Sequence, residues 1–120
     1  MKPFKLIIAG GRDFADKALF LRAMQQVEQE LAEYLVSLVS GMAKGADMMG
    51  YMFANEHGIT CHKFPANWNK YGKAAGFRRN QEMADFSDGL VAFWDGQSHG
   101  TKHMIETMKT QNKWIMVVRY

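Results

Sequence analysis

The sequence predicts an α/β fold of one domain, residues 1–120, with a five-stranded parallel sheet covered by helices on both faces. Short apolar runs alternate with segments of helical period along the whole chain, and three of the runs end in glycine-containing loops. A length of 120 residues with 48% hydrophobic residues suits one domain with its own core. Right-handed crossovers then join successive strands.

The first half of the chain predicts two strands and two helices. Residues 5–10 (KLIIAG) form an apolar run closed by glycine, which is typical of a buried strand entering a turn. From residue 16 to residue 34 apolar side chains recur at three- and four-residue steps, and Asp13 or Asp16 can cap this helix. Residues 34–40 predict the second strand, and a helix over 46–57 ends before Gly58.

The second half predicts three strands and two helices. Residues 59–64 (ITCHKF) form the third strand, and a polar, aromatic loop over 65–76 leads into a helix that runs to about Phe86. Residues 89–94 predict the fourth strand, 101–112 the fourth helix and 113–118 the fifth strand. If the strand order is 3-2-1-4-5, strands one and four adjoin where the order reverses, which is where such sheets bind ligands.

Composition excludes several classes of protein. The single cysteine, Cys61, rules out an internal disulfide and a Cys-based zinc site, and we expect a buried structural thiol. No apolar stretch of about 18 residues and no signal peptide is present, so we expect a cytoplasmic protein without membrane contact. A net charge of +3 favours an anionic partner, but it does not choose between a nucleotide and a polynucleotide.

Three glycine-containing loops predict an anion site: GGRDF, SGMAKGAD and WDGQSHGT. Each follows a predicted strand and precedes a helix, where free N–H groups and the helix dipole favour an anion. Plain turn formation is the alternative for any one loop. Neither a P-loop, GxxxxGK[ST], nor a GxGxxG motif is present, which disfavours a nucleoside triphosphatase or a standard dinucleotide enzyme, and we expect no cofactor.

Basic and aromatic residues around the third helix are candidates for phosphate and base contacts. Adjacent helical residues diverge by about 100°, so only one of Arg78 and Arg79 is expected to face the crevice. Trp68, Tyr71 and Phe77 can form a base-stacking surface. A solvated basic face and aromatics that merely seal the core are the alternatives.

Other polar residues carry weaker predictions. His99 and His103 have a spacing that can chelate a metal, but no third ligand is identifiable, so we predict no metal site. Asp13 and Asp47 follow glycine turns and can accept from a ribose hydroxyl, although helix capping is the favoured role for either. The methionine-rich patch at residues 48–52 predicts core or subunit-interface packing.

These motifs together resemble the YspA-like branch of the SLOG superfamily, which also includes the LOG phosphoribohydrolases and the DNA-processing protein A family. GGRDF, SGMAKGAD, PANWNKYGKAAGFRRNQEMAD and VAFWDGQSHGT carry the resemblance, over nearly the whole chain. The resemblance implies a Rossmann-like sheet that binds a nucleotide or nucleotide-derived ligand, usually in a homo-oligomer.

The LOG enzymes have a segment of the form RKxxMxxxSDAFIALPGGxGTxxE, and RNQEMADFSDGLVAFWDGQSHGT is similar to it. Arg79 falls on the arginine of that pattern, and Gly100 and Thr101 fall on its final Gly-Thr. The catalytic glutamate expected three residues after the threonine is replaced by Met104. Asp95 is the one carboxylate that could substitute for it.

We therefore expect binding of a nucleotide or nucleotide-derived signal, by a sensor or a sequestering protein. A phosphoribohydrolase and a single-stranded nucleic-acid binder are the alternatives, the latter needing a larger basic track than +3 provides. The candidate ligand-binding residues are Gly10, Gly11, Arg12, Asp13, Ser40, Gly41, Gly45, Asp47, Trp68, Arg79, Asp95, Gly96, Gly100 and Thr101.

Overall fold

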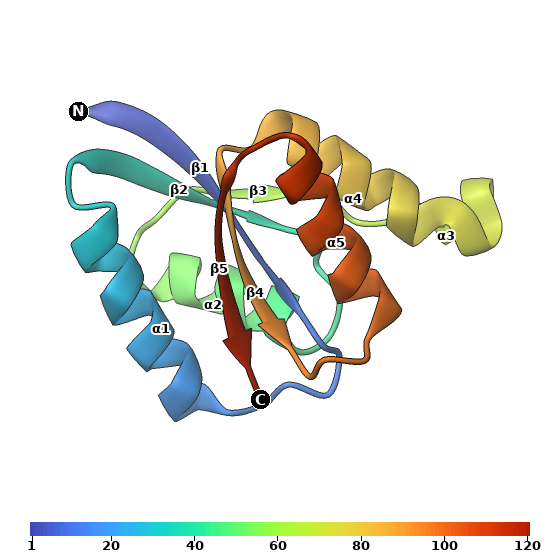
Figure 1. The fold of residues 1–120 in the computed structure, drawn as a ribbon, viewed down its shortest axis with the longest axis horizontal. Coiled ribbons are helices and arrows are strands. Elements are labelled where there is room, and N and C mark those ends of the chain that lie inside the picture. The colour runs from blue at the N-terminus through green and yellow to red at the C-terminus, as the bar shows by residue number, and fades with distance from the viewer.

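The computed structural model describes residues 1–120 and contains a five-stranded, all-parallel sheet of order β3-β2-β1-β4-β5 (Figure 1). This arrangement confirms the predicted α/β class. The strands are β1 (Lys2–Gly10), β2 (Tyr34–Ser40), β3 (Cys61–Lys63), β4 (Gly89–Trp94) and β5 (Trp114–Arg119). The helices are α1 (Lys17–Glu30), α2 (Ala46–Glu56), α3 (Trp68–Tyr71), α4 (Ala75–Phe86) and α5 (His99–Thr110), with a 3₁₀ turn, η1 (Gly72–Ala74), between α3 and α4.

Helices cover both faces of the sheet, and the alternation of β1 divides the core into two clusters. Leu6 and Ile8 point to the face where α1 and α2 pack. Ile7 and Ala9 point to the other face, where they meet α4 and α5. Gly50 of α2 lies so close to Ile8 that an added Cβ would come within 2.7 Å of it, so the glycine lets this helix approach the sheet.

Several predicted boundaries were wrong because tertiary contacts extend or shorten the elements. β1 begins at Lys2 rather than residue 5, since residues 2–4 pair in register with residues 34–36 of β2. α1 ends at Glu30 instead of residue 34, and the Leu31 N–H donates to the Val27 carbonyl at 2.8 Å as the chain turns into β2. β3 has only three residues, because pairing with β2 covers only residues 61–63.

Two helix starts also differ from prediction. The expected loop over 65–76 contains α3, which Asn67 caps by accepting from the Lys70 N–H at 3.1 Å. α5 begins at His99, two residues before the predicted start, because Asp95 accepts from the preceding N–H groups and organises the turn. Cys61 is partly rather than fully buried on β3. None of the helices combines the length and the apolar character that a membrane crossing requires.

The strand order reverses between β1 and β4, which are hydrogen-bonded neighbours. From β1 the chain progresses through β2 to β3 at one edge of the sheet, and it then returns to β4 and β5 on the other side of β1. The loops that follow β1 and β4 therefore meet beyond the carboxyl ends of these two strands, in the position typical of ligand sites in open α/β sheets.

Candidate functional site

A cavity of about 500 Å³ opens beyond the carboxyl ends of β1 and β4. This volume lies within the range of about 300–1,000 Å³ that small-molecule sites occupy. Residues of all three glycine-containing loops and of α4 reach it. The predicted site residues that line it are Gly10, Gly11, Arg12, Asp13, Asp47, Trp68, Arg79, Asp95, Gly100 and Thr101.

Arg79 of α4 lies partly buried in the cavity wall and is held by neutral oxygen acceptors. Its Nη1 donates to the carbonyl of Gly41 at 2.6 Å and to that of Phe64 at 3.4 Å. Burial lowers its pKa below the usual arginine range. The only ion pair in the chain joins Lys102 to Glu106, so no carboxylate pairs with Arg79. The guanidinium is thus oriented by the protein and forms no direct ion pair, although the Asp47 carboxyl lies close enough to interact with its charge.

Arg78 lies elsewhere. Its guanidinium carbon sits 4.0 Å from the centre of the Tyr71 ring, and it does not line the cavity. The two adjacent arginines of α4 therefore have different surroundings, as their angular separation on the helix requires.

Asn80 connects α4 to the first turn of α5. Its Oδ1 accepts from Arg79 Nε at 3.1 Å, and its Nδ2 donates to the Gly100 carbonyl at 3.2 Å. The same Nδ2 lies 3.2 Å from Nδ1 of His103. Asn80 is only 6% exposed, so these contacts replace water for a buried amide.

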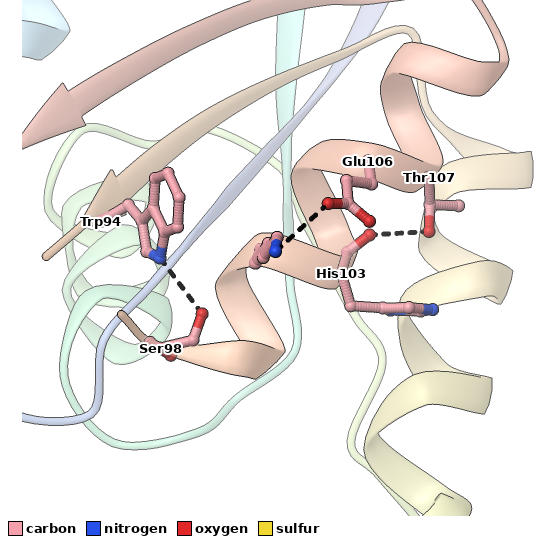
Figure 2. Close-up of polar contacts among 6 residues, drawn as sticks. Trp94, Ser98, His103, Glu106 and Thr107 are labelled. Carbon is pink, nitrogen blue, oxygen red and sulfur yellow. Dashed lines mark hydrogen bonds and ion pairs between the residues drawn. The ribbon is translucent and has the colours of Figure 1, made fainter. Parts of the chain in front are cut away.

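The loop between β4 and α5 is organised by Asp95. One carboxylate oxygen accepts from the N–H groups of Gln97 and Ser98, both at 2.8 Å, and these bonds lower the pKa of Asp95. Trp94 Nε1 donates to the Ser98 carbonyl at 3.1 Å, as Figure 2 shows. The loop thus enters α5 in a fixed conformation.

The N-terminus of α5 itself has no side-chain cap hydrogen bond. The first helical N–H groups, those of His99, Gly100 and Thr101, donate to no protein acceptor, because the first bond of the helix runs from Lys102 to Ser98. A Cβ added at Gly100 would meet no protein atom within 4 Å. This turn therefore offers free donors and open space to a ligand.

Asp47 of α2 is a buried carboxyl at the cavity wall, only 4% exposed. Burial raises its pKa from 3.8 to about 6, and the nearby Arg79 charge opposes this rise. The Ala43 N–H donates to its Oδ2 at 3.4 Å. A carboxyl with this pKa becomes protonated below about pH 6, where its neutral form no longer repels an anionic ligand.

Two half-exposed aromatic rings, Trp68 and Phe77, lie at the cavity. A Cβ on Gly76 would come within 3.3 Å of the Trp68 ring, so this glycine lets the indole lie against α4. The Arg12 guanidinium carbon lies 5.9 Å from the Trp68 ring centre, and Lys73 lines the same cavity. The cavity therefore combines aromatic surfaces with further cations.

Asp13 is held by Tyr120, whose hydroxyl donates to its Oδ1 at 2.6 Å. The Tyr120 ring also packs against Phe14, with 4.9 Å between ring centres. Burial and the Asp13 carboxylate raise the pKa of Tyr120 well above its usual range, so it remains a donor. Asp13 does not cap α1, since Asp16 accepts from the Leu19 N–H.

Four predicted site residues do not line the cavity and support its walls instead. Ser40 is fully buried, and its Oγ donates to the Asp47 carbonyl at 2.8 Å. Gly41 accepts from Arg79. Gly45, with φ +82°, lies against the Gly11 carbonyl, and Gly96, with φ +87°, lies under the Arg119 guanidinium. No group of three or more His, Cys, Asp or Glu side chains comes together in a metal-binding arrangement.

Sequence reasoning missed Asn80 and the link from it to His103. The signal in the sequence was the spacing of Asn80 three and four residues before Met83 and Ala84, which puts it on the apolar face of the helix, where an amide requires partners. Ser98, Lys73 and Gly76 also line the cavity without having been predicted as site residues.

Comparison with known proteins shows two relationships. A family model described as "YspA, cpYpsA-related SLOG family" matches residues 4–71, which include most of β1, all of β2 and the loops that follow them. The "Gene 61 protein" of Mycobacterium phage D29 is 30% identical over 122 residues, covering 97% of this chain and 95% of its own length. No solved structure matches. The chain belongs to the YspA, cpYpsA-related SLOG family.

Proposed function

We propose that the cavity binds a nucleotide or nucleotide-derived ligand, with a phosphate between Arg79 and the first turn of α5. The observation that carries the proposal is the Arg79 guanidinium, which is partly buried, held by neutral oxygens and without a carboxylate partner. A partly buried cation that forms no direct ion pair favours an anionic ligand, and arginine matches the geometry of phosphate oxygens. Membership of the SLOG family supports a nucleotide-related role.

The remaining lining of the cavity fits the other parts of a nucleotide. Trp68 and Phe77 are half-exposed aromatic rings, and base–aromatic stacking contributes roughly 1–3 kcal/mol per base. The free N–H groups at the start of α5 suit phosphate oxygens, and Arg12 and Lys73 add positive charge at the rim. In this account the protein acts as a sensor or a sequestering protein.

We propose binding rather than hydrolysis. Met104 is 1% exposed and lines the cavity where the LOG pattern has its glutamate, and a thioether neither accepts a proton nor offsets positive charge. Asp95 is already engaged by two N–H groups through one oxygen. A net charge of +3 and a cavity in place of a long basic track also disfavour single-stranded nucleic acid.

Native mass spectrometry of freshly purified protein tests the proposal. We expect a co-purifying ligand, or one added from a nucleotide panel, whose mass identifies the base and the number of phosphates. The same spectrum gives the subunit count and so tests the expected homo-oligomer. Absence of a bound nucleotide at every concentration tried, in a folded sample, would contradict the proposed function.

A further inference from the structure

We infer that His103 is a positioning residue of the proposed anion site: its neutral, Nε2-protonated ring holds the Asn80 amide in the orientation that ties Arg79 to α5. The consequence for ligand binding rests on the proposed function. The tautomer of the ring itself is determined only by the hydrogen bonds among Arg79, Asn80, Gly100 and His103.

Two hydrogen-bond partners determine the orientation of the Asn80 amide, because one of them can only donate and the other can only accept. Arg79 Nε can only donate, so the Asn80 atom that faces it at 3.1 Å is the oxygen. The Gly100 carbonyl can only accept, so the atom that faces it at 3.2 Å is the NH₂ group. The two assignments agree, and the amide therefore has one orientation.

This orientation determines the tautomer of His103. Asn80 Nδ2 has two hydrogens, one for the Gly100 carbonyl and one that faces Nδ1 of His103 at 3.2 Å. Nδ1 must then be the unprotonated acceptor, and a neutral imidazole carries its hydrogen on Nε2. The ring extends from α5 toward α4 (Figure 2), where it packs on Phe77 with 4.4 Å between ring centres.

Protonation of His103 conflicts with this arrangement. A hydrogen on Nδ1 would face the Asn80 NH₂, so two donors would meet. Rotation of the amide would relieve that contact, but it would place the NH₂ against Arg79 Nε, which is also a donor. Either outcome removes at least one of the bonds that connect Arg79 to Gly100, at a cost of about 0.5–1.5 kcal/mol for a typical bond.

The surroundings of His103 shift its pKa in opposite directions. Burial lowers its pKa, and Glu106, one turn further along α5, partly opposes that shift. From α4 the uncharged Phe77 and Asn80 face the ring, with Arg79 behind Asn80. The buried face of α5 carries Met104, Ile105 and Met108 together with Thr101, and none of these side chains is charged. Asp47 also titrates in this region, and its neutralisation favours an anion, whereas protonation of His103 breaks the hydrogen bonds that position Arg79 although it adds a positive charge.

The variant His103→Asn separates these effects. Its side-chain oxygen takes the place of Nδ1 as an acceptor for Asn80, but it does not titrate. The phosphate of the ligand and Asp47 titrate in both proteins. The ratio of the wild-type affinity to the His103→Asn affinity at each pH therefore reports the effect of His103. We expect equal affinity for a nucleoside monophosphate at pH 7.5, and a loss of about threefold to tenfold in the wild type relative to His103→Asn at pH 5. An unchanged ratio, or tighter relative binding by the wild type at pH 5, would overturn the inference.

A ligand-free arm keeps the inference testable if no nucleotide binds. ¹⁵N NMR of the wild type at pH 7.5 should show His103 with a protonated Nε2 and an unprotonated Nδ1. Asp47 titrates beside Arg79 in both proteins, so the Nε–H signal of Arg79 should shift with pH in both, and only the wild type should show an additional shift that follows the titration of His103. A protonated Nδ1 in the neutral ring, or an Arg79 signal that titrates identically in both proteins, would overturn the positioning role. Failure of both proteins to bind any nucleotide, with the NMR result as expected, would count against the proposed function alone.

Discussion

Arg79 and Asn80, consecutive residues of α4, are joined by a hydrogen bond of 3.1 Å from Arg79 Nε to Asn80 Oδ1. Together with the carbonyls of Gly41 and Phe64, this bond orients the guanidinium and leaves its Nη2 without a protein acceptor. The cation is therefore held in place before a ligand arrives. A site prepared in this way loses little conformational freedom on binding.

Replacement of Arg79 by alanine should weaken nucleotide binding. Charge-assisted hydrogen bonds contribute about 1.5–3 kcal/mol, which corresponds to roughly a tenfold to hundredfold loss of affinity. Arg78→Ala is the matched control, because Arg78 stacks on Tyr71 outside the cavity, and it should bind within about twofold of the wild type. Calorimetric titration gives both affinities. A larger loss of affinity in Arg78→Ala than in Arg79→Ala would mean that Arg78, and not Arg79, contacts the phosphate.

Gly100→Val should abolish nucleotide binding and leave the fold intact. No protein atom lies within 4 Å of the position of the new Cβ, so the side chain occupies only space proposed for the ligand. Gly10→Val and Gly45→Val differ, because a Cβ added at Gly10 would come within 2.5 Å of the Phe93 carbonyl oxygen and Gly45 has a φ of +82°. We expect both to unfold at lower temperature than Gly100→Val, as measured by circular dichroism. Full affinity in a folded Gly100→Val protein would contradict the placement of the phosphate at α5.

Asp47 should make stability depend on pH. Its pKa is raised on folding, so the free energy of unfolding is highest below the unfolded value of 3.8 and declines as the pH rises through about 6. The rise of the Asp47 pKa corresponds to a free energy of unfolding that is lower by up to about 3 kcal/mol at neutral pH than at acidic pH. Asp47→Asn should remove most of that decline, measured as the difference between urea unfolding at pH 4.5 and at pH 7.5.

Glu82→Gln serves as the control for Asp47→Asn. Glu82 is an exposed residue of α4, and its carboxylate forms no hydrogen bond or ion pair with the protein. The Glu82→Gln variant should leave the pH dependence as in the wild type. If Asp47→Asn and Glu82→Gln show the same change between the two pH values, burial of Asp47 is not the source of the effect.

We expect no appreciable release of base from nucleoside monophosphates. Loss of general acid–base help typically costs about 10²–10⁴-fold in rate, and Met104 stands where the related pattern has its glutamate. Incubation with a panel of nucleoside monophosphates, followed by chromatography of free base, measures this directly. Asp95→Asn retains an oxygen for the Gln97 and Ser98 N–H groups and so preserves the start of α5. Robust turnover that disappears in Asp95→Asn would favour the alternative function, a phosphoribohydrolase.

The sequence predicted the sheet and much of the cavity lining because these depend on local patterns. Apolar runs such as LVAFW and the glycine loops identify strands and the edge where their loops gather. The ends of the elements depend on partners far along the chain, as in the pairing of Lys2 with Tyr34, and no local pattern reports them.

The role of each residue within the site was less accessible to sequence reasoning. Gly45 and Gly96 suit their positive φ angles. Anion-binding loops and purely structural turns use the same glycine-containing sequences, so the sequence does not tell them apart. The contacts of Asn80 depend on how α4 packs against α5, which spacing along either helix does not reveal. The sequence indicated for His103 only a chelating spacing from His99 and no role in the site, since its amide partner lies 23 residues away.

The most direct test of the central claim is an NMR titration of the ¹⁵N-labelled protein with a nucleoside monophosphate. The account predicts saturable shifts that are largest at the backbone N–H groups of His99, Gly100 and Thr101 and at Arg79 Nε, with smaller shifts at the indole N–H of Trp68. Shifts confined to other surfaces, such as the apolar groove between α1 and α2 at Phe20 and Met52, or the absence of saturable shifts with every nucleotide tried, would contradict it.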